Sequence, residues 1–145
     1  MQSNRKGFRG YIRARMEMGR STPQHIQQMV MREYCKKNNM EYLLAATEYL
    51  MPGCTMILDG ALDELDHMEG IVMYSIYLLP SSHTKRMKIY QRLFEKGCSL
   101  HAAVENIAIR TMQDAKRVEE CWLVHEVMLG QTDSDMEALK HYATN

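Results

Sequence analysis

Arginine and tyrosine alternate near the amino terminus in an arrangement that could bind an anion. The residues that share one parity are Arg9, Tyr11, Arg13 and Arg15. On a regular strand they would project from one face at steps of about 6.6 Å. A buried guanidinium without a partner is costly, so these side chains must reach solvent or meet carboxylates or a bound anion. Two interpretations stay open: an edge strand whose arginines pair with Glu48 and Glu105, or a binding site for phosphate, carboxylate or a sugar nucleotide.

Gln24 and His25 stand where a helix is expected to begin. They follow Ser21-Thr22-Pro23, which supplies a capping residue and a proline for the first turn. The free backbone amides and the dipole of a first helical turn favour an anion. We predict that His25 and Glu48 serve as acid and base if a reaction occurs. The alternative for His25 is a hydrogen-bonding cap or a solvated side chain.

Further polar residues fall near the ends of predicted strands, and open parallel sheets bind ligands beyond the carboxyl ends of their strands. We predict that Arg13 and Arg15 hold the anion and that Gln24 and Thr47 contact hydroxyl groups. The other predicted binding residues are Arg9, Tyr49, Ser75 and Glu105. Ser75 is expected to pack rather than to attack a substrate, because no histidine or aspartate stands at a spacing that marks a catalytic triad.

His101 and Glu105 share parity on the predicted fourth strand. They could therefore lie on one face of that strand, about two steps apart. The alternative is a buried, hydrogen-bonded histidine and an exposed carboxylate.

Composition argues against several other classes of function. The 145 residues carry no formal net charge, which gives no general attraction to nucleic acid or to an acidic membrane. No apolar run approaches the roughly 18 residues that span a bilayer, so we expect a cytoplasmic protein without a membrane partner. The four cysteines are scattered without a CxxC pair, which indicates core thiols and argues against a zinc site. We predict no metal, and no cofactor can be named.

Hydrophobic patterns predict alternating strands and helices. Strands are expected at residues 8–14, 41–49, 70–79 and 99–105, and helices at 23–37, 55–68, 83–96 and 111–129. This order predicts a doubly wound α/β fold with a mainly parallel sheet of four to five strands and a long last helix. Residues 1–130 would form one domain, and residues 131–145 a polar tail with at most a short helix from 134 to 142.

The last predicted helix carries an apolar stripe of Val118, Trp122, His125 and Leu129. This stripe supports a second hypothesis, a non-catalytic interaction module in which the helix containing Trp122 forms a homodimer. The alternative is that Trp122 packs against its own sheet.

The segment Tyr11-Ile12-Arg13-Ala14-Arg15 resembles the Tyr-x-Arg-Val-Ser motif of the serine recombinases of the resolvase and invertase family. Arginine stands in the place of the nucleophilic serine. The second family signature, Leu-Asp-Arg-Leu-Gly-Arg, falls on residues 76–81, where its acidic residue and both arginines are missing. Only Arg13 carries over. The resemblance implies a resolvase-like or flavodoxin-like fold without strand-exchange activity.

A second resemblance covers most of the chain. Its segments are Gly7-Phe8-Arg9-Gly10-Tyr11-Ile12, Pro23-Gln24-His25-Ile26-Gln27, Tyr34-Cys35, Ala46-Thr47-Glu48-Tyr49, Met51-Pro52, Glu69-Gly70-Ile71-Val72 and Leu79-Pro80. They resemble the bacterial sporadic carbohydrate cluster proteins, which implies a role in the biosynthesis of surface polysaccharide or related glycans. The favoured hypothesis is therefore a small protein that binds an anionic sugar or nucleotide-sugar metabolite at the carboxyl edge of its sheet. If the protein is an enzyme, we expect it to catalyse a step that modifies this metabolite.

Overall fold

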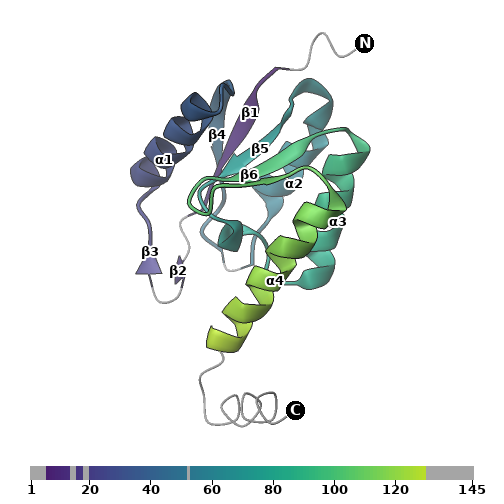
Figure 1. Cartoon of the computed structure of the whole chain (residues 1–145). Coiled ribbons are helices and arrows are strands. Elements are labelled where there is room, and N and C mark those ends of the chain that lie inside the picture. The colour runs from purple at the N-terminus through teal and green to yellow at the C-terminus, as the bar shows by residue number, and fades with distance from the viewer. Residues whose placement is uncertain (1–5, 14–15, 18–19, 52, 130–145) are drawn as a thin grey trace.

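Short apolar segments form the parallel strands of a central sheet: β1 (Phe8–Ile12), β4 (Tyr42–Thr47), β5 (Gly70–Met73) and β6 (Ser99–Ala102). A fifth strand, β7 (Ile107–Ile109), pairs antiparallel with β6. The strand order is β4-β1-β5-β6-β7. The computed structural model describes residues 6–13, 16–17, 20–51 and 53–129 (Figure 1). The predicted doubly wound and mainly parallel sheet is confirmed.

Helices cover both faces of this sheet, as the alternation of β1 requires (Figure 1). Phe8 and Ile12 of β1 face one side, where they pack with Met31 of α1 (Gln24–Lys37). Tyr11 faces the other side and joins the larger core. That core is built with α2 (Met56–Asp63), α3 (His83–Glu95) and α4 (Met112–Leu129). Strands β2 (Met16–Glu17) and β3 (Arg20–Ser21) form a separate antiparallel pair.

The apolar run 70–79 is shorter as a strand than predicted. Strand β5 ends at Met73, and the chain then forms a 3-10 turn, η2 (Ile76–Leu78). Ser75 begins this turn, because its hydroxyl accepts a hydrogen bond from the backbone amide of Tyr77. The continuous hydrophobicity reflects burial of both segments, which is not specific to strands.

Two other boundaries also differ from the prediction. The fourth strand ends at Ala102 instead of residue 105, and Asn106 takes a positive φ of 55° where the chain turns back into β7. The predicted helix 55–68 is divided into α2 and a 3-10 turn, η1 (Leu65–His67). The predicted helix at 134–142 lies outside the described residues.

Gly70 shows how closely the central strands approach. A Cβ atom at this position would lie 2.0 Å from the backbone carbonyl oxygen of Ser99 in β6. A side chain is therefore excluded at the start of β5. None of the described helices has the length and apolarity that a bilayer crossing needs.

Candidate functional site

The order of the strands reverses at β1, which has β4 on one side and β5 on the other. In this class of sheet, ligands bind beyond the carboxyl ends of the strands at such a switch point. The chain places a group of buried and half-buried polar side chains there, which we call the switch-point cluster: Tyr11, Arg13, Gln27, Glu48 and Cys54.

Glu48 follows β4 and is 3% exposed. Its Oε1 accepts hydrogen bonds from the Tyr11 hydroxyl at 2.7 Å and from the backbone amide of Leu58 at 3.2 Å. Its Oε2 accepts from the amide of Ile57 at 2.9 Å, and also from Tyr49 N and Cys54 Sγ. The carboxylate thus binds the amides of the first turn of α2.

Burial alone would raise the pKa of Glu48, but these hydrogen bonds outweigh it and hold the pKa below its usual value. Burial and the hydrogen bond to Glu48 raise the pKa of Tyr11, which stays protonated and donates. Glu48 is therefore a fixed negative charge whose two oxygens are both occupied.

Arg13 follows β1 and is 4% exposed. Its Nη1 donates to the Tyr11 hydroxyl at 3.2 Å, and within the described chain its guanidinium makes no ion pair. Gln27 of α1 fixes the backbone of this residue on both sides. The Gln27 side chain accepts from Arg13 N at 3.3 Å and donates to Arg13 O at 3.0 Å. The position of Arg13 is thus set by its neighbours, and within the described residues the Tyr11 hydroxyl is the hydrogen-bond partner of its guanidinium.

The predicted arginine ladder is divided between two environments. Arg9 donates to the carbonyl of Leu44 at 2.8 Å and lies 3.7 Å from the carboxylate of Glu64 at the end of α2. Arg13 reaches Glu48 only through Tyr11. For Arg9 and Arg13, the interpretation that the arginines pair with Glu48 and Glu105 is therefore wrong. Arg15 lies outside the described residues.

Ser75 and Glu105 are brought together in a second polar group. The Ser75 hydroxyl donates to Glu105 Oε2 at 2.7 Å, and Glu105 Oε1 accepts from the amide of Ile76 at 3.0 Å. Both residues stabilise the turn after β5. Glu105 lies in the turn between β6 and β7, so the predicted placement of His101 and Glu105 on one strand face is wrong.

The remaining predicted site residues are exposed at the surface. Gln24 and His25 lie in the first turn of α1, and Thr47 and Tyr49 lie at and just after the end of β4. No hydrogen bond or ion pair joins His25 to another described residue. Its predicted role with Glu48 thus has no geometric support.

Gln27, like Cys54, belongs to the switch-point cluster but was not among the predicted site residues. It shares a helical stripe with Met31 and Tyr34, which are both buried, so it is a polar residue on an inward-facing side of α1. A polar residue in such a stripe needs hydrogen-bond partners, and that need is the signal that could have revealed it. Among the described residues, no three His, Cys, Asp or Glu side chains gather closely enough to hold a metal ion.

The apolar stripe of α4 packs within its own domain. Trp122 Nε1 donates to the carbonyl of Ile76 at 3.3 Å, and the Arg86 guanidinium lies 4.3 Å from the centre of the indole ring. His125 stacks on Tyr77 with ring centroids 4.2 Å apart. Of the two interpretations for Trp122, internal packing is confirmed.

No protein-family profile matches the chain, and no curated protein matches it. Solved structures with a similar fold include two recombinase domains. A resolvase family site-specific recombinase from Streptococcus pneumoniae is 13% identical, with a TM-score of 0.57 over 95% of this chain and 99% of that one. The N-terminal catalytic domain of TP901-1 integrase is 11% identical, with a TM-score of 0.55 over 81% of this chain and 94% of that one.

Similarity at this level of identity concerns the fold. It confirms the structural resemblance to serine recombinase catalytic domains that residues 11–15 indicated. The resemblance to sporadic carbohydrate cluster proteins stays a prediction. The chain has a resolvase-like α/β fold.

Proposed function

We propose that the chain binds an anionic ligand at the switch-point cluster, with Arg13 as the principal cationic contact. The single observation that carries this proposal is the state of Arg13. It is almost completely buried. Among the described residues its guanidinium has no carboxylate partner, and the hydrogen bond to Tyr11 uses one of its five donors. A buried cation in this state is stabilised when an anion binds to it.

Neighbouring residues support the same assignment. Gln27 holds the backbone of Arg13 in place, so binding requires little reordering of that residue. The Tyr11 hydroxyl lies between Arg13 and Glu48: it accepts a hydrogen bond from the guanidinium and donates one to the carboxylate. This arrangement prevents a direct ion pair between Arg13 and Glu48. The positive charge is therefore not neutralised from within the cluster.

The class of ligand comes from the sequence. The resemblance to sporadic carbohydrate cluster proteins favours a sugar phosphate or a nucleotide sugar, in which a phosphate group would meet Arg13. Binding is better supported than catalysis, because both oxygens of Glu48 are occupied and His25 lies exposed on α1. The proposed function is thus recognition of an anionic metabolite.

Thermal unfolding with and without UDP-glucose or inorganic pyrophosphate tests this function. We expect ligand to raise the melting temperature of the wild type and to have no effect on Arg13→Gln, because the variant lacks the charge that meets the phosphate. Arg9→Gln is the matched control, since Arg9 lies on the same strand and already has a carboxylate neighbour. It should retain the ligand-induced shift. If neither anion raises the melting temperature of the wild type, the proposal is wrong.

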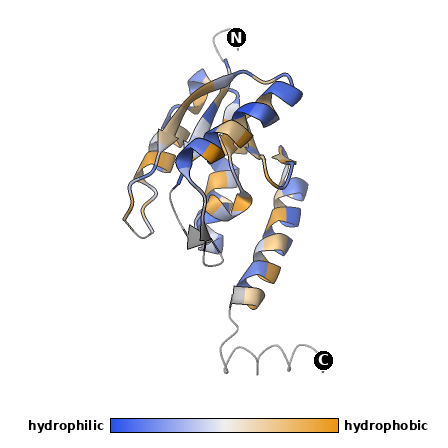
Figure 2. Ribbon diagram, turned by 90° about the vertical axis from the view of Figure 1, so that its left-hand side faces the viewer, coloured by the Kyte–Doolittle hydropathy of each residue, from blue (hydrophilic) through white to orange (hydrophobic). Residues whose placement is uncertain are grey.

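A second candidate function is a homodimeric interaction module, and the outer face of α4 favours it. Leu123, Val124 and Met128 are 57%, 59% and 53% exposed. All three lie on the exposed part of α4, which we call its outer face, and the helix extends beyond the rest of the domain (Figure 2). The homodimer expected through the helix containing Trp122 would therefore use this outer face. The molar mass in solution tests this candidate.

A further inference from the structure

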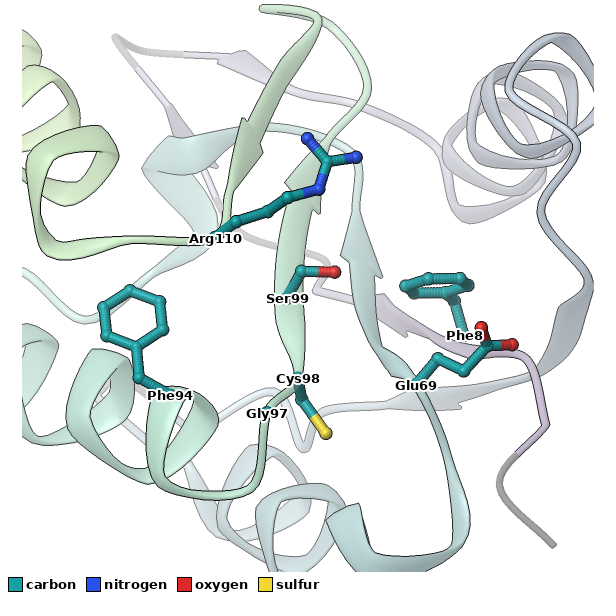
Figure 3. A pocket seen from close by; sticks show the side chains of 7 residues that line it. All are labelled: Phe8, Glu69, Phe94, Gly97, Cys98, Ser99 and Arg110. Atoms are coloured by element: carbon teal, nitrogen blue, oxygen red, sulfur yellow. The ribbon is translucent and has the colours of Figure 1, made fainter. Parts of the chain in front are cut away.

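A cavity of about 450 Å³ lies at the amino edge of the sheet, at the opposite ends of the strands from the switch-point cluster. Its walls come from five places in the chain. Phe8 begins β1, Glu69 precedes β5, Ser99 begins β6, and Phe94 stands near the end of α3. Because β7 runs antiparallel, it returns the chain to this same edge and delivers Arg110 (Figure 3).

A buried hydrogen-bonded chain leads to the wall of this cavity. Tyr34 Oη lies 2.8 Å from His101 Nδ1, and His101 Nε2 lies 2.9 Å from Ser99 Oγ. His101 is 1% exposed and also meets the ring of Phe8 edge-on. The hydroxyl of Ser99, which lines the cavity, is thus held by a rigid internal network.

The donor and acceptor in each hydrogen bond of this network follow from the requirement that buried polar groups have partners. The Tyr34 hydroxyl is buried, and His101 Nδ1 is its hydrogen-bond partner in the described chain, so the phenol proton is donated to Nδ1. The imidazole proton then lies on Nε2 and is donated to Ser99 Oγ. Ser99 accepts that bond, which leaves its own proton free to be donated into the cavity.

This network does not make Ser99 a nucleophile. Burial and the charge of Arg110 lower the pKa of His101 to about 4, so the ring is neutral near pH 7 and resists protonation. No carboxylate contacts His101 in the described chain to stabilise an imidazolium. A serine that accepts from its histidine cannot also give that histidine its proton, as general-base activation would require. The network instead positions a hydrogen-bond donor.

Arg110 supplies the second donor. Its side chain is exposed, and its guanidinium has no hydrogen bond or ion pair within the described residues. Its positive charge acts to lower the pKa values of both His101 and Tyr34, as expected for a guanidinium beside the hydrogen-bond network that ends at Ser99. One guanidinium and one hydroxyl proton together favour an oxyanion.

The other walls restrict which anion fits. Glu69 places a carboxylate at the cavity, and one of its oxygens accepts a hydrogen bond from the backbone amide of Gly7 at 2.8 Å. This negative charge disfavours a dianion such as phosphate. Phe8 and Phe94 offer aromatic surface to an apolar ligand body. We propose that this cavity binds a small monoanionic carboxylate with an aromatic or apolar body, whose carboxylate meets Arg110 and the hydroxyl of Ser99.

Binding of phenylacetate to the full chain, measured by calorimetry and by ¹H–¹⁵N chemical-shift mapping, tests the proposal. We expect a dissociation constant of about 1 mM or tighter, which ten non-hydrogen atoms can supply. Arg110→Gln should weaken binding at least tenfold, and Ser99→Ala about fivefold. Arg117→Gln, which removes another exposed arginine, on α4, should bind like the wild type. Benzyl alcohol, which lacks the charge, should bind far more weakly.

Three outcomes would overturn the proposal. The first is that the wild type shows no binding at millimolar phenylacetate. The second is that the variants or the mapping point elsewhere: Arg110→Gln binds phenylacetate as well as Arg117→Gln does, or the chemical-shift changes map to Arg13 instead of the cavity. The third is that inorganic phosphate competes as strongly as phenylacetate, which would indicate a general oxyanion site. Thermal unfolding of each variant checks that it is folded. Because Arg110 is exposed, its substitution should leave the fold intact and keeps the test valid even if substitution of half-buried Ser99 unfolds the protein.

Discussion

Glu48 accepts hydrogen bonds from three backbone amides and from the side chains of Tyr11 and Cys54 among the described residues. These donors link the end of β4, the start of α2 and the carboxyl end of β1 through one carboxylate. Its ionised form is favoured by this environment, so its charge contributes to the stability of the fold. A single side chain thus organises the edge of the sheet where Arg13 lies.

We expect Glu48→Gln to lower the free energy of unfolding by about 2–3 kcal/mol, because an amide replaces one acceptor oxygen with a donor facing other donors. Urea unfolding measures this change. Glu64→Gln is the control: that carboxylate is exposed and lies 3.7 Å from Arg9, so its loss should cost under about 1 kcal/mol. Since the pKa of Glu48 is lowered by folding, its contribution is present above the ordinary carboxyl pKa and is lost as pH falls below it. Equal stability of the two variants would contradict this account.

Some residues of the candidate site could be predicted from sequence and others could not. Arg13 and Glu48 were predicted from the alternation of side chains along a strand and from the tendency of open parallel sheets to bind ligands beyond the carboxyl ends of their strands. Both signals depend only on local order along the chain. The bond between Ser75 and Glu105 joins residues 30 positions apart, so it depends on how β5 and the β6–β7 turn meet in space. The hydrogen-bonded chain at the amino edge was missed for the same reason: Tyr34 and His101 are 67 positions apart.

At the scale of elements, Glu119 fixes α4 to α3. Its carboxylate accepts from Arg86 Nε and Nη2, both at 2.8 Å, and from the Tyr90 hydroxyl at 2.7 Å. Burial would raise the pKa of Glu119, but the bonds from Arg86 and Tyr90 outweigh it and lower the pKa to about 2. Arg86 is itself buried and lies over the indole of Trp122, so this ion pair supports the packing of the whole helix.

Glu119→Gln should therefore destabilise the protein by about 3 kcal/mol, because it leaves a buried guanidinium without its counter-charge. Glu120→Gln, a substitution of the exposed neighbour, should change stability by less than about 0.5 kcal/mol. In the wild type the pKa of Glu119 is lower in the folded state, so its stabilisation is complete above the ordinary carboxyl pKa of about 4.3 and is lost as pH falls toward 2. The fluorescence of Trp122 during acid titration reports this loss. A profile that is unchanged in Glu119→Gln would contradict the assignment.

The elements themselves were largely predictable. Helix α1 begins and ends within a residue of its predicted limits, because Pro23 and Asn38 mark its ends locally. The antiparallel strand β7 was missed because it is only three residues long, and the positive φ of Asn106 that reverses the chain carries no glycine signature. Hydrophobicity also merged β5 and η2 into one strand, since it records burial rather than geometry.

At the scale of the whole molecule, the outer face of α4 is the surface on which a second copy would pack. Light scattering coupled to size-exclusion chromatography should give the mass of a dimer for the wild type, because the exposed apolar side chains of α4 would be buried between copies. Val124→Glu should be monomeric. Met29→Glu is the control, since Met29 is an equally exposed apolar residue on α1. A wild type that stays monomeric at high concentration would exclude this dimer.

The reversed direction of β7 has a mechanical consequence for the last helix. It makes α4 start at the amino edge, immediately after Arg110, and cross the domain so that Trp122 meets Ile76 beyond the carboxyl end of β5. Eighteen residues of helix form a rod about 27 Å long. A spin label on Met128, at the far end of that rod, would therefore sense a tilt that begins at Arg110, and one spectroscopic reporter can monitor events at both edges of the sheet.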